Sequence, residues 1–173
     1  IRFGEVAVEF DAKSADRTRF IIPIGRSDLP SAQRQDLHTL DFDRSGSLLV
    51  YGGAGAGKST LLRSIAVSAS TMYSPRDLNV YAIDFSTQSL SALQSLPHCA
   101  GAMTGRELDR VRQAVTVLHM ALAERQQLAE DEGVGSLAEL RAKGHRLPYL
   151  MLLLDGFAQF FDAFEERHND SLF

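Results

Sequence analysis

Tryptophan is absent from this 173-residue sequence, and cysteine occurs only once, at Cys99. A single cysteine excludes an internal disulfide and is compatible with a reducing compartment. No apolar run approaches the roughly 20 residues of a membrane span, and no signal peptide is recognisable. A basic excess is missing too, because 22 acidic residues outweigh 18 basic ones, for a net charge of −4. The sequence therefore has no electrostatic footprint for nucleic acid.

Metal-binding patterns are also missing. The five histidines are scattered, and none stands at ligand spacing from another histidine or from the cysteine. What the chain does have is apolar content of 45%, enough for a real core. Its length suits one α/β domain, so residues 1–173 are interpreted as a single domain. It begins with Ile1 rather than methionine, which favours a piece of a longer chain.

A glycine-rich stretch carries the strongest chemical signal. It reads Gly52, Gly53, Ala54, Gly55, Ala56, Gly57, Lys58, Ser59, Thr60. This is the G-x-x-x-x-G-K-[ST] pattern of the phosphate-binding loop, Walker A. Small residues let the backbone N–H groups curl around a triphosphate as an anion nest. Lys58 is predicted to contact the β- and γ-phosphates, and the Ser59 hydroxyl to ligate Mg²⁺. ATP and Mg²⁺ are the ligands that follow.

The flanking residues support this interpretation over a flexible Gly/Ala linker. Residues 47–51 form a short apolar run typical of a buried strand. After the loop, apolar residues recur at helical spacing as far as about Met72. Strand, glycine loop and helix is the arrangement that the motif requires.

A second nucleotide signature lies downstream. Residues 149–154 are an apolar strand that ends in Asp155, the Walker B pattern. Its carboxylate is predicted to hold Mg²⁺ opposite Ser59. Many P-loop ATPases carry a glutamate directly after this aspartate to activate water, but this chain has Gly156. Glycine cannot accept a proton, so we expect nucleotide binding with slow or absent hydrolysis.

Another carboxylate could take over as the base. Asp84 ends the apolar strand predicted at 80–84, and ligands of open α/β sheets bind beyond such strand ends. It is the candidate catalytic residue, and a helix cap or turn is the equally weighted alternative. Glu165 and Glu166 fall on the helix predicted at 157–166, where a solvated face is the expected role.

The remaining patterns predict an α/β fold with a mostly parallel central sheet flanked by helices. Strands are predicted at 3–10, 20–24, 38–42 and 100–103, with a loop at 25–35 and a turn at 43–46. Helices are predicted at 89–96, from the capping box Thr104/Glu107 to about 130, and from the capping box Ser136/Glu139 to Gly144. Residues 1–46 are assigned to an N-terminal β extension, and residues 47–173 to the P-loop core.

Several segments resemble a known family. Pro23-Ile24-Gly25, Asp28-Leu29-Pro30 and Gln33-Arg34-Gln35, followed by the Walker A strand, resemble the opening of FtsK/SpoIIIE-type ATPase domains. The downstream resemblance is to the ATPase modules of EccC, the motor of type VII (ESX) secretion systems. It is carried by Leu93-Gln94-Ser95-Leu96-Pro97-His98, by Glu124-Arg125, and by Leu147-Pro148 leading into Asp155-Gly156-Phe157.

The resemblance implies a RecA/FtsK-like P-loop fold whose further strands follow Walker B. It implies a soluble module of a membrane-anchored complex, on the cytoplasmic side and without membrane contact of its own. The implied partners are other ATPase modules and the C-terminal signal of a WXG100 (Esx) substrate. It also places the loop Arg26–Gln35 near the edge of the nucleotide, as a candidate for adenine contact.

Four functions are compatible with these features. The leading one is an Mg·ATP-binding module, with weak or no hydrolysis, that regulates export or recognises its substrate. An active hydrolase would need Asp84 or a residue of a neighbouring module. A DNA translocase, the activity of better-known FtsK relatives, is disfavoured by the acidic balance. A peptide-binding module is compatible with the first.

Overall fold

A three-stranded parallel sheet forms the centre of the fold. The structure is a computed structural model, which describes residues 19–169. β3 (Leu78–Asp84) lies in the middle, with β4 (Cys99–Thr104) on one side and β5 (Tyr149–Asp155) on the other. All three strands run in one direction, so their carboxyl ends meet at one edge of the sheet. The predicted α/β fold with a mostly parallel sheet is confirmed.

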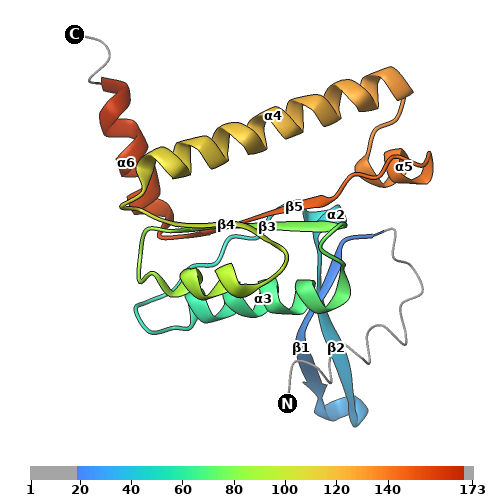
Figure 1. Ribbon diagram of the computed structural model, residues 1–173. Helices are drawn as coiled ribbons and strands as arrows, with labels where there is room; N and C mark the ends of the chain where they lie inside the picture. The colour runs from blue at the N-terminus through green and yellow to red at the C-terminus, as the bar shows by residue number, and fades with distance from the viewer. Residues whose placement is uncertain (1–18, 170–173) are drawn as a thin grey trace.

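Helices cover both faces of this sheet (Figure 1). α3 (Lys58–Met72) packs on one face, while α4 (Leu108–Glu132) crosses the other, and α6 (Phe157–Asn169) follows directly after β5. The alternation of side chains along β3 explains the two cores. Val80 and Ala82 join the cluster with Ile65 of α3, while Ile83 packs with Val111 of α4.

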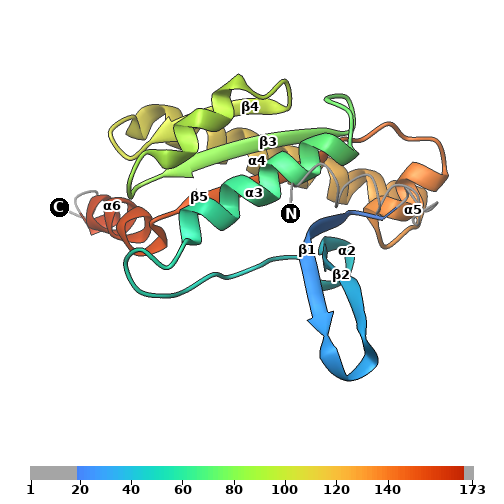
Figure 2. The same cartoon turned by 90° about the horizontal axis from the view of Figure 1, so that it is seen from below.

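A β-hairpin extends away from this body (Figure 2). β1 (Ile21–Leu29) pairs antiparallel with β2 (Arg34–Asp41) through the short 3-10 turn η1 (Pro30–Ala32). The prediction of a loop at 25–35 is therefore wrong. Pairing extends along the ribbon to Leu29 and Arg34, because a turn of only a few residues reverses the chain. The strand predicted at 3–10 lies outside the described residues.

The base of the hairpin is fixed by aromatic residues. Phe20 stacks on Tyr149 of β5, with ring centroids 4.3 Å apart, and its ring also contacts Phe42 and Tyr73. Phe42 opens the single turn α2 (Phe42–Ser45), where the sequence predicts a turn. The Tyr73 hydroxyl accepts a hydrogen bond from the N–H of Ile21 at 3.0 Å. Burial raises the pKa of Tyr73 to about 12, so this hydroxyl stays protonated.

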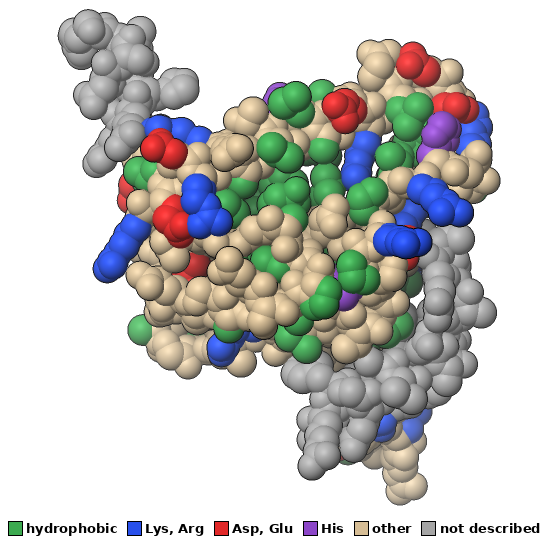
Figure 3. All heavy atoms as spheres, in the orientation of Figure 1, with side chains coloured by type: hydrophobic (Ala, Val, Ile, Leu, Met, Phe, Trp, Pro, Cys, Tyr) green, Lys and Arg blue, Asp and Glu red, His purple; other side chains and the backbone are tan. Residues whose placement is uncertain are grey.

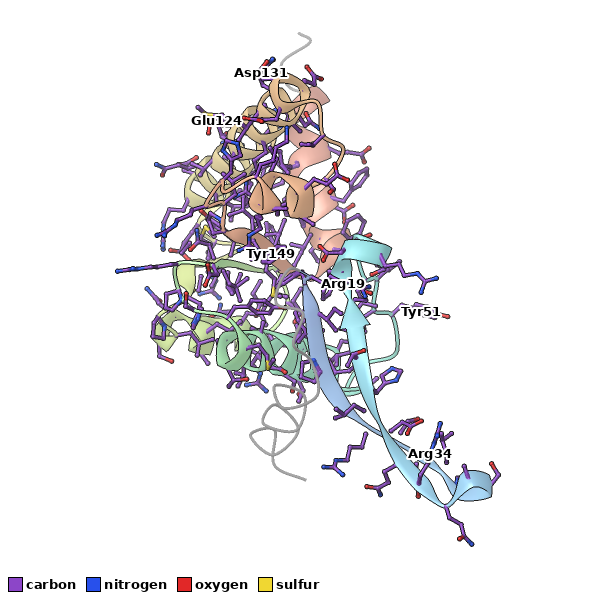
Figure 4. The ribbon with its side chains drawn as sticks, turned by 90° about the vertical axis from the view of Figure 1, so that its right-hand side faces the viewer. Arg19, Arg34, Tyr51, Glu124, Asp131 and Tyr149 are labelled. Carbon is purple, nitrogen blue, oxygen red and sulfur yellow. The ribbon has the colours of Figure 1, made fainter. Side chains whose placement is uncertain are left out.

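The segment that leads into the glycine loop departs from expectation. Residues 47–51, predicted as a buried strand, form no strand and join neither sheet of the described chain. Leu49 is 76% exposed and Tyr51 is 91% exposed, and Figure 4 shows Tyr51 pointing away from the body. Residues 47–51 therefore lack the pairing that stabilises a strand, and within the described residues β5 pairs on its β3 side only.

The helix ends agree with the sequence to different degrees. α4 begins at Leu108, so the predicted Thr104 N-cap is wrong, because Thr104 is the last residue of β4. Glu107 still reaches back to the N–H of Thr104 at 3.0 Å. The N-cap of the second capping box is confirmed: Ser136 caps α5 (Leu137–Ala142) by accepting from the N–H of Glu139. The Glu139 carboxylate accepts from the N–H of Gly135, one residue before the N-cap. The predicted helix at 89–96 is the 3-10 segment η2 (Ser89–Ser95).

Candidate functional site

The glycine loop adopts the backbone that an anion nest needs. Gly55 and Gly57 have φ angles of +76° and +85°, a region that residues with a Cβ rarely adopt. α3 starts immediately after them, at Lys58. Gly57 is its N-cap and offers no side-chain capping bond, so the first N–H groups of the helix remain available to a phosphate.

Lys58 is bound to its own loop. Its ammonium donates to the carbonyl oxygens of Gly52 and Gly53, at 2.9 and 2.8 Å. The two carbonyl oxygens thus keep the Lys58 ammonium beside the glycine loop. A triphosphate would offer the ammonium stronger, charged acceptors than two neutral carbonyls. The arrangement therefore suits a ligand that is multiply negative.

Ser59 and Asp155 are brought together from 96 residues apart. The Ser59 hydroxyl donates to Oδ2 of Asp155, which ends β5 and is only 6% exposed. A hydroxyl and a carboxylate are hard oxygen donors of the kind that Mg²⁺ takes, with phosphate and water oxygens completing its octahedron. These residues fit Mg·ATP: the loop and helix end would hold its phosphates, and Ser59 with Asp155 its metal.

Asp84 lies at the same strand edge, paired in register with Asp155. Its side chain is 2% exposed. Both carboxylate oxygens accept backbone hydrogen bonds, from Ser86 at 2.8 Å and Leu90 at 3.0 Å. This geometry matches the capping alternative for Asp84, since both oxygens bind backbone N–H groups and the buried side chain does not line the cavity described below.

A cavity of about 1280 Å³ joins these parts. Its walls are the glycine loop, β5 and the first turn of α6. Ser86 and Thr87, from the loop after β3, and Gln159 of α6 also line it. The sequence reasoning missed these three polar residues, although each follows the carboxyl end of a sheet strand. No residue of the described range 26–35 lines the cavity, and the hairpin tip with Arg34 projects away from it (Figure 4).

Clustered metal ligands and membrane-spanning helices are both absent from residues 19–169. Within that range, no group of three or more histidine, cysteine, aspartate or glutamate side chains is close enough to hold a metal ion. A magnesium ion at Ser59 and Asp155 would therefore depend on phosphate and water for its other ligands. In the described part of the chain, no helix has the length and apolar character of a membrane span.

The loop, the helix end and the Ser59–Asp155 pair, placed at the carboxyl edge of a parallel sheet, define a P-loop nucleotide-binding domain. The comparison with protein families agrees. The sequence profile of the FtsK/SpoIIIE family matches residues 10–161. This chain belongs to the FtsK/SpoIIIE family.

The relatives are secretion ATPases. The chain is 34% identical over 132 residues to the ESX secretion system protein EccC of Thermomonospora curvata, covering 74% of this chain and 10% of that protein. It is 35% identical over 119 residues to the ESX-1 secretion system protein EccCb1 of Mycolicibacterium smegmatis, covering 68% of this chain and 20% of that one. The chain thus spans a tenth to a fifth of the length of these relatives.

A solved structure is similar as well. ATPases 2 and 3 of Thermomonospora curvata EccC, in complex with a signal sequence peptide, align with a TM-score of 0.78 at 30% identity. The alignment covers 88% of this chain and 29% of that one. The resemblance to EccC-type modules is confirmed.

Proposed function

We propose that this chain is an Mg·ATP-binding module of a type VII secretion motor, with weak or no hydrolysis of its own. The observation that carries the proposal is the contrast between its two signatures. Lys58, Ser59 and Asp155 converge on one cavity, whereas Gly156 stands where a water-activating glutamate would follow Asp155. Binding groups are retained without the usual base. Such a module acts through the bound nucleotide, in regulation or in substrate recognition.

The test is to incubate the purified protein with Mg²⁺ and labelled ATP, remove free ligand and identify what stays bound. Retained ATP supports the proposal. Retained ADP overturns weak hydrolysis, and an empty protein overturns binding. Lys58→Ala should abolish retention, because it removes the side-chain cation that donates to the glycine loop. Lys143→Ala is the matched control, since Lys143 pairs with Glu132 at the far end of α4.

Active hydrolysis is the alternative proposal. It would need Asp84, or a residue of a neighbouring module, as the base. The two backbone hydrogen bonds that Asp84 accepts favour the neighbour over Asp84. Steady phosphate release from the isolated protein that disappears in Asp84→Ala would reverse that preference.

A specific observation favours peptide recognition as a second function. The face of β5 turned toward α4 is only partly covered, because Leu152 is 46% exposed. Leu122 of α4 and Phe161 of α6 are also exposed, at 55% and 49%. Figure 3 shows apolar side chains gathered below α4. Exposed apolar surface of this kind marks binding sites, and the similar EccC structure was solved with a signal sequence peptide.

Titration of a labelled C-terminal peptide of a secreted WXG100 substrate tests this function. Leu152→Asp should weaken binding, because it places a charge on the apolar face. Ser95→Asp, which adds the same charge to an exposed residue of η2, is the control. Equal affinity of the two variants would contradict peptide binding at this face.

The setting that we propose for the module is the cytoplasmic side of the cell membrane, in a membrane-anchored secretion complex beside other ATPase modules. The names of the relatives support this setting. Fractionation of cells that express the native protein, with and without the membrane components of the secretion system, tests it. Recovery in the membrane fraction only when those components are present is the expected result.

A further inference from the structure

Gly156 stands at a position where any side chain would be strained. Its φ angle is +79°, and a Cβ added there would lie 3.0 Å from both the carbonyl carbon and the Cβ of Phe85. Phe85 cannot easily move, because its N–H donates to the carbonyl oxygen of Asp155 at 2.8 Å. Its ring packs edge-on against Phe160 at 5.5 Å and fills the space beside Gly105, where a Cβ would lie 2.6 Å from the ring. A glutamate at 156 would thus be strained, in its backbone angle and in its contact with Phe85.

Another polar group lies beside that position. The Oε1 atom of Gln159 is 3.2 Å from where the Cβ of residue 156 would be. Gln159 sits in the first turn of α6 and lines the same cavity as Ser59 and Asp155. Its side chain is exposed, and its amide makes no hydrogen bond with another residue in the range 19–169. The amide is therefore free to bind water or ligand.

We propose that Gln159 is the water-positioning residue of this site. The inference rests on the proposed function, in which Mg·ATP occupies the cavity. An amide can accept a hydrogen bond from water through Oε1 and donate through Nε2 to a phosphoryl oxygen. Gln159 would hold water in line with the γ-phosphorus. A bond from the water oxygen to phosphorus forms as the bond to the bridging oxygen breaks, and ADP leaves with that electron pair. The proton lost by the water ends on the released phosphate.

This role predicts slow turnover instead of none. Gln159 orients water but cannot remove its proton, since an amide is not a base at neutral pH. Orientation without general-base assistance forgoes a factor of about 10²–10⁴ in rate. The alternative for Gln159 is structural: at the third position of a helix, glutamine can reach back to the N-cap, here Gly156, whose carbonyl accepts from the N–H of Phe160.

The deciding experiment compares two ligands that differ only at the transferring phosphoryl group. Affinity is measured for Mg·ADP and for Mg·ADP with aluminium fluoride, a mimic of the transition state that includes the attacking water. Gln159→Ala should leave the affinity for Mg·ADP within about twofold and weaken the aluminium fluoride complex by about tenfold or more. Gln113→Ala, on the exposed face of α4, should change neither. A purely structural role would weaken both ligands equally or neither.

Gln159→Glu gives a second, opposite readout. It keeps the helix-capping capacity and supplies a carboxylate beside the water, so single-turnover hydrolysis should rise by about tenfold or more. Equal affinity of wild type and Gln159→Ala for the aluminium fluoride complex would overturn the role of Gln159 and leave ATP binding intact. A wild-type protein that binds Mg·ADP but forms no such complex would overturn it as well. Failure of the wild type to bind any nucleotide would remove both proposals.

Discussion

The backbone of Phe85 occupies the space that a side chain on Gly156 would need, and its carbonyl carbon lies 3.0 Å from the position of the missing Cβ. The φ of +79°, which is strained for any residue with a Cβ, adds to this conflict. We therefore expect Gly156→Glu to lower the free energy of unfolding by about 1–3 kcal/mol without restoring rapid ATP hydrolysis. Chemical denaturation and a phosphate-release assay measure the two effects.

Gly135→Glu is the matched control for that variant, because a Cβ added at Gly135 would have nothing within 4 Å and the residue has no positive φ. It should change stability by less than about 0.5 kcal/mol. A Gly156→Glu protein with wild-type stability and fast turnover would show that Phe85 yields to the new side chain.

The contact between Ser59 and Asp155 predicts how the site responds to metal removal. Wild-type affinity for ATP should fall when Mg²⁺ is chelated, because the ion links these oxygens to the phosphates. In Asp155→Asn, the affinity in Mg²⁺ should fall toward the chelated value, since the carboxylate charge that holds the ion is gone. Titration of a fluorescent ATP analogue with and without chelator measures this. If chelation of Mg²⁺ lowered the ATP affinity of Asp155→Asn as much as that of the wild type, the carboxylate would be excluded as a metal ligand.

Asp84 should contribute to stability more than to nucleotide binding. Replacing it with alanine leaves the N–H groups of Ser86 and Leu90 without their acceptor, at a cost of about 1–3 kcal/mol. Thermal unfolding should shift downward while ATP affinity stays near wild type. Asp162→Ala, on the exposed surface of α6, is the control. Loss of hydrolysis without loss of stability would instead support a catalytic Asp84.

The exposure of residues 47–51 has a measurable consequence. Leu49 is 76% exposed, so Leu49→Ser should cost less than about 0.5 kcal/mol. Leu153→Ala, at a site that is 5% exposed in β5, should cost about 2–5 kcal/mol. Comparable losses in the two variants would mean that 47–51 is buried in solution, as the sequence pattern alone predicts.

The junction between α4 and α5 predicts a pH dependence. Hydrogen bonds from Lys143 and His145 lower the pKa of Glu132. A lowered folded-state pKa means that this contribution is present above the unfolded pKa of about 4.3 and is lost as pH falls through the folded value. Glu132→Gln should therefore reduce stability at pH 7 and leave it unchanged at the acid end of that window. Parallel stability curves for both proteins across this range would contradict the assignment.

The sequence predicted which residues meet at the site better than it predicted which strands pair. Lys58, Ser59 and Asp155 could be recognised because phosphate and Mg²⁺ dictate both residue type and spacing. The strands at 78–84 and 149–155 followed from continuous apolar runs. The β-hairpin pairing at 25–35 could not be predicted, because polar and turn-forming residues are typical of a loop. The pairing there results from the chain reversal at η1. The absence of a strand at 47–51 could not be predicted either. Whether an apolar run forms a strand depends on pairing with a segment that is distant in the sequence.

The roles of Gln159 and Phe85 could not be predicted from the sequence, for a different reason. Their importance depends on distances to Gly156, which no spacing rule encodes. The apolar stripe predicted along α4 was only partly informative. Val111 is fully buried, but Leu122 is 55% exposed, because α4 contacts the sheet near its first turns and then leaves it (Figure 1).

The hydrogen bonds from Lys58 to the carbonyls of Gly52 and Gly53 should make the loop favour polyphosphates over smaller anions. Any anion entering the nest competes with two hydrogen bonds that the ammonium already makes. A ligand with one or two charges would gain little over those carbonyls, whereas a polyphosphate would contact the ammonium, the helix end and the metal together. If the proposed nucleotide site is right, inorganic phosphate should therefore compete poorly with ATP for this loop.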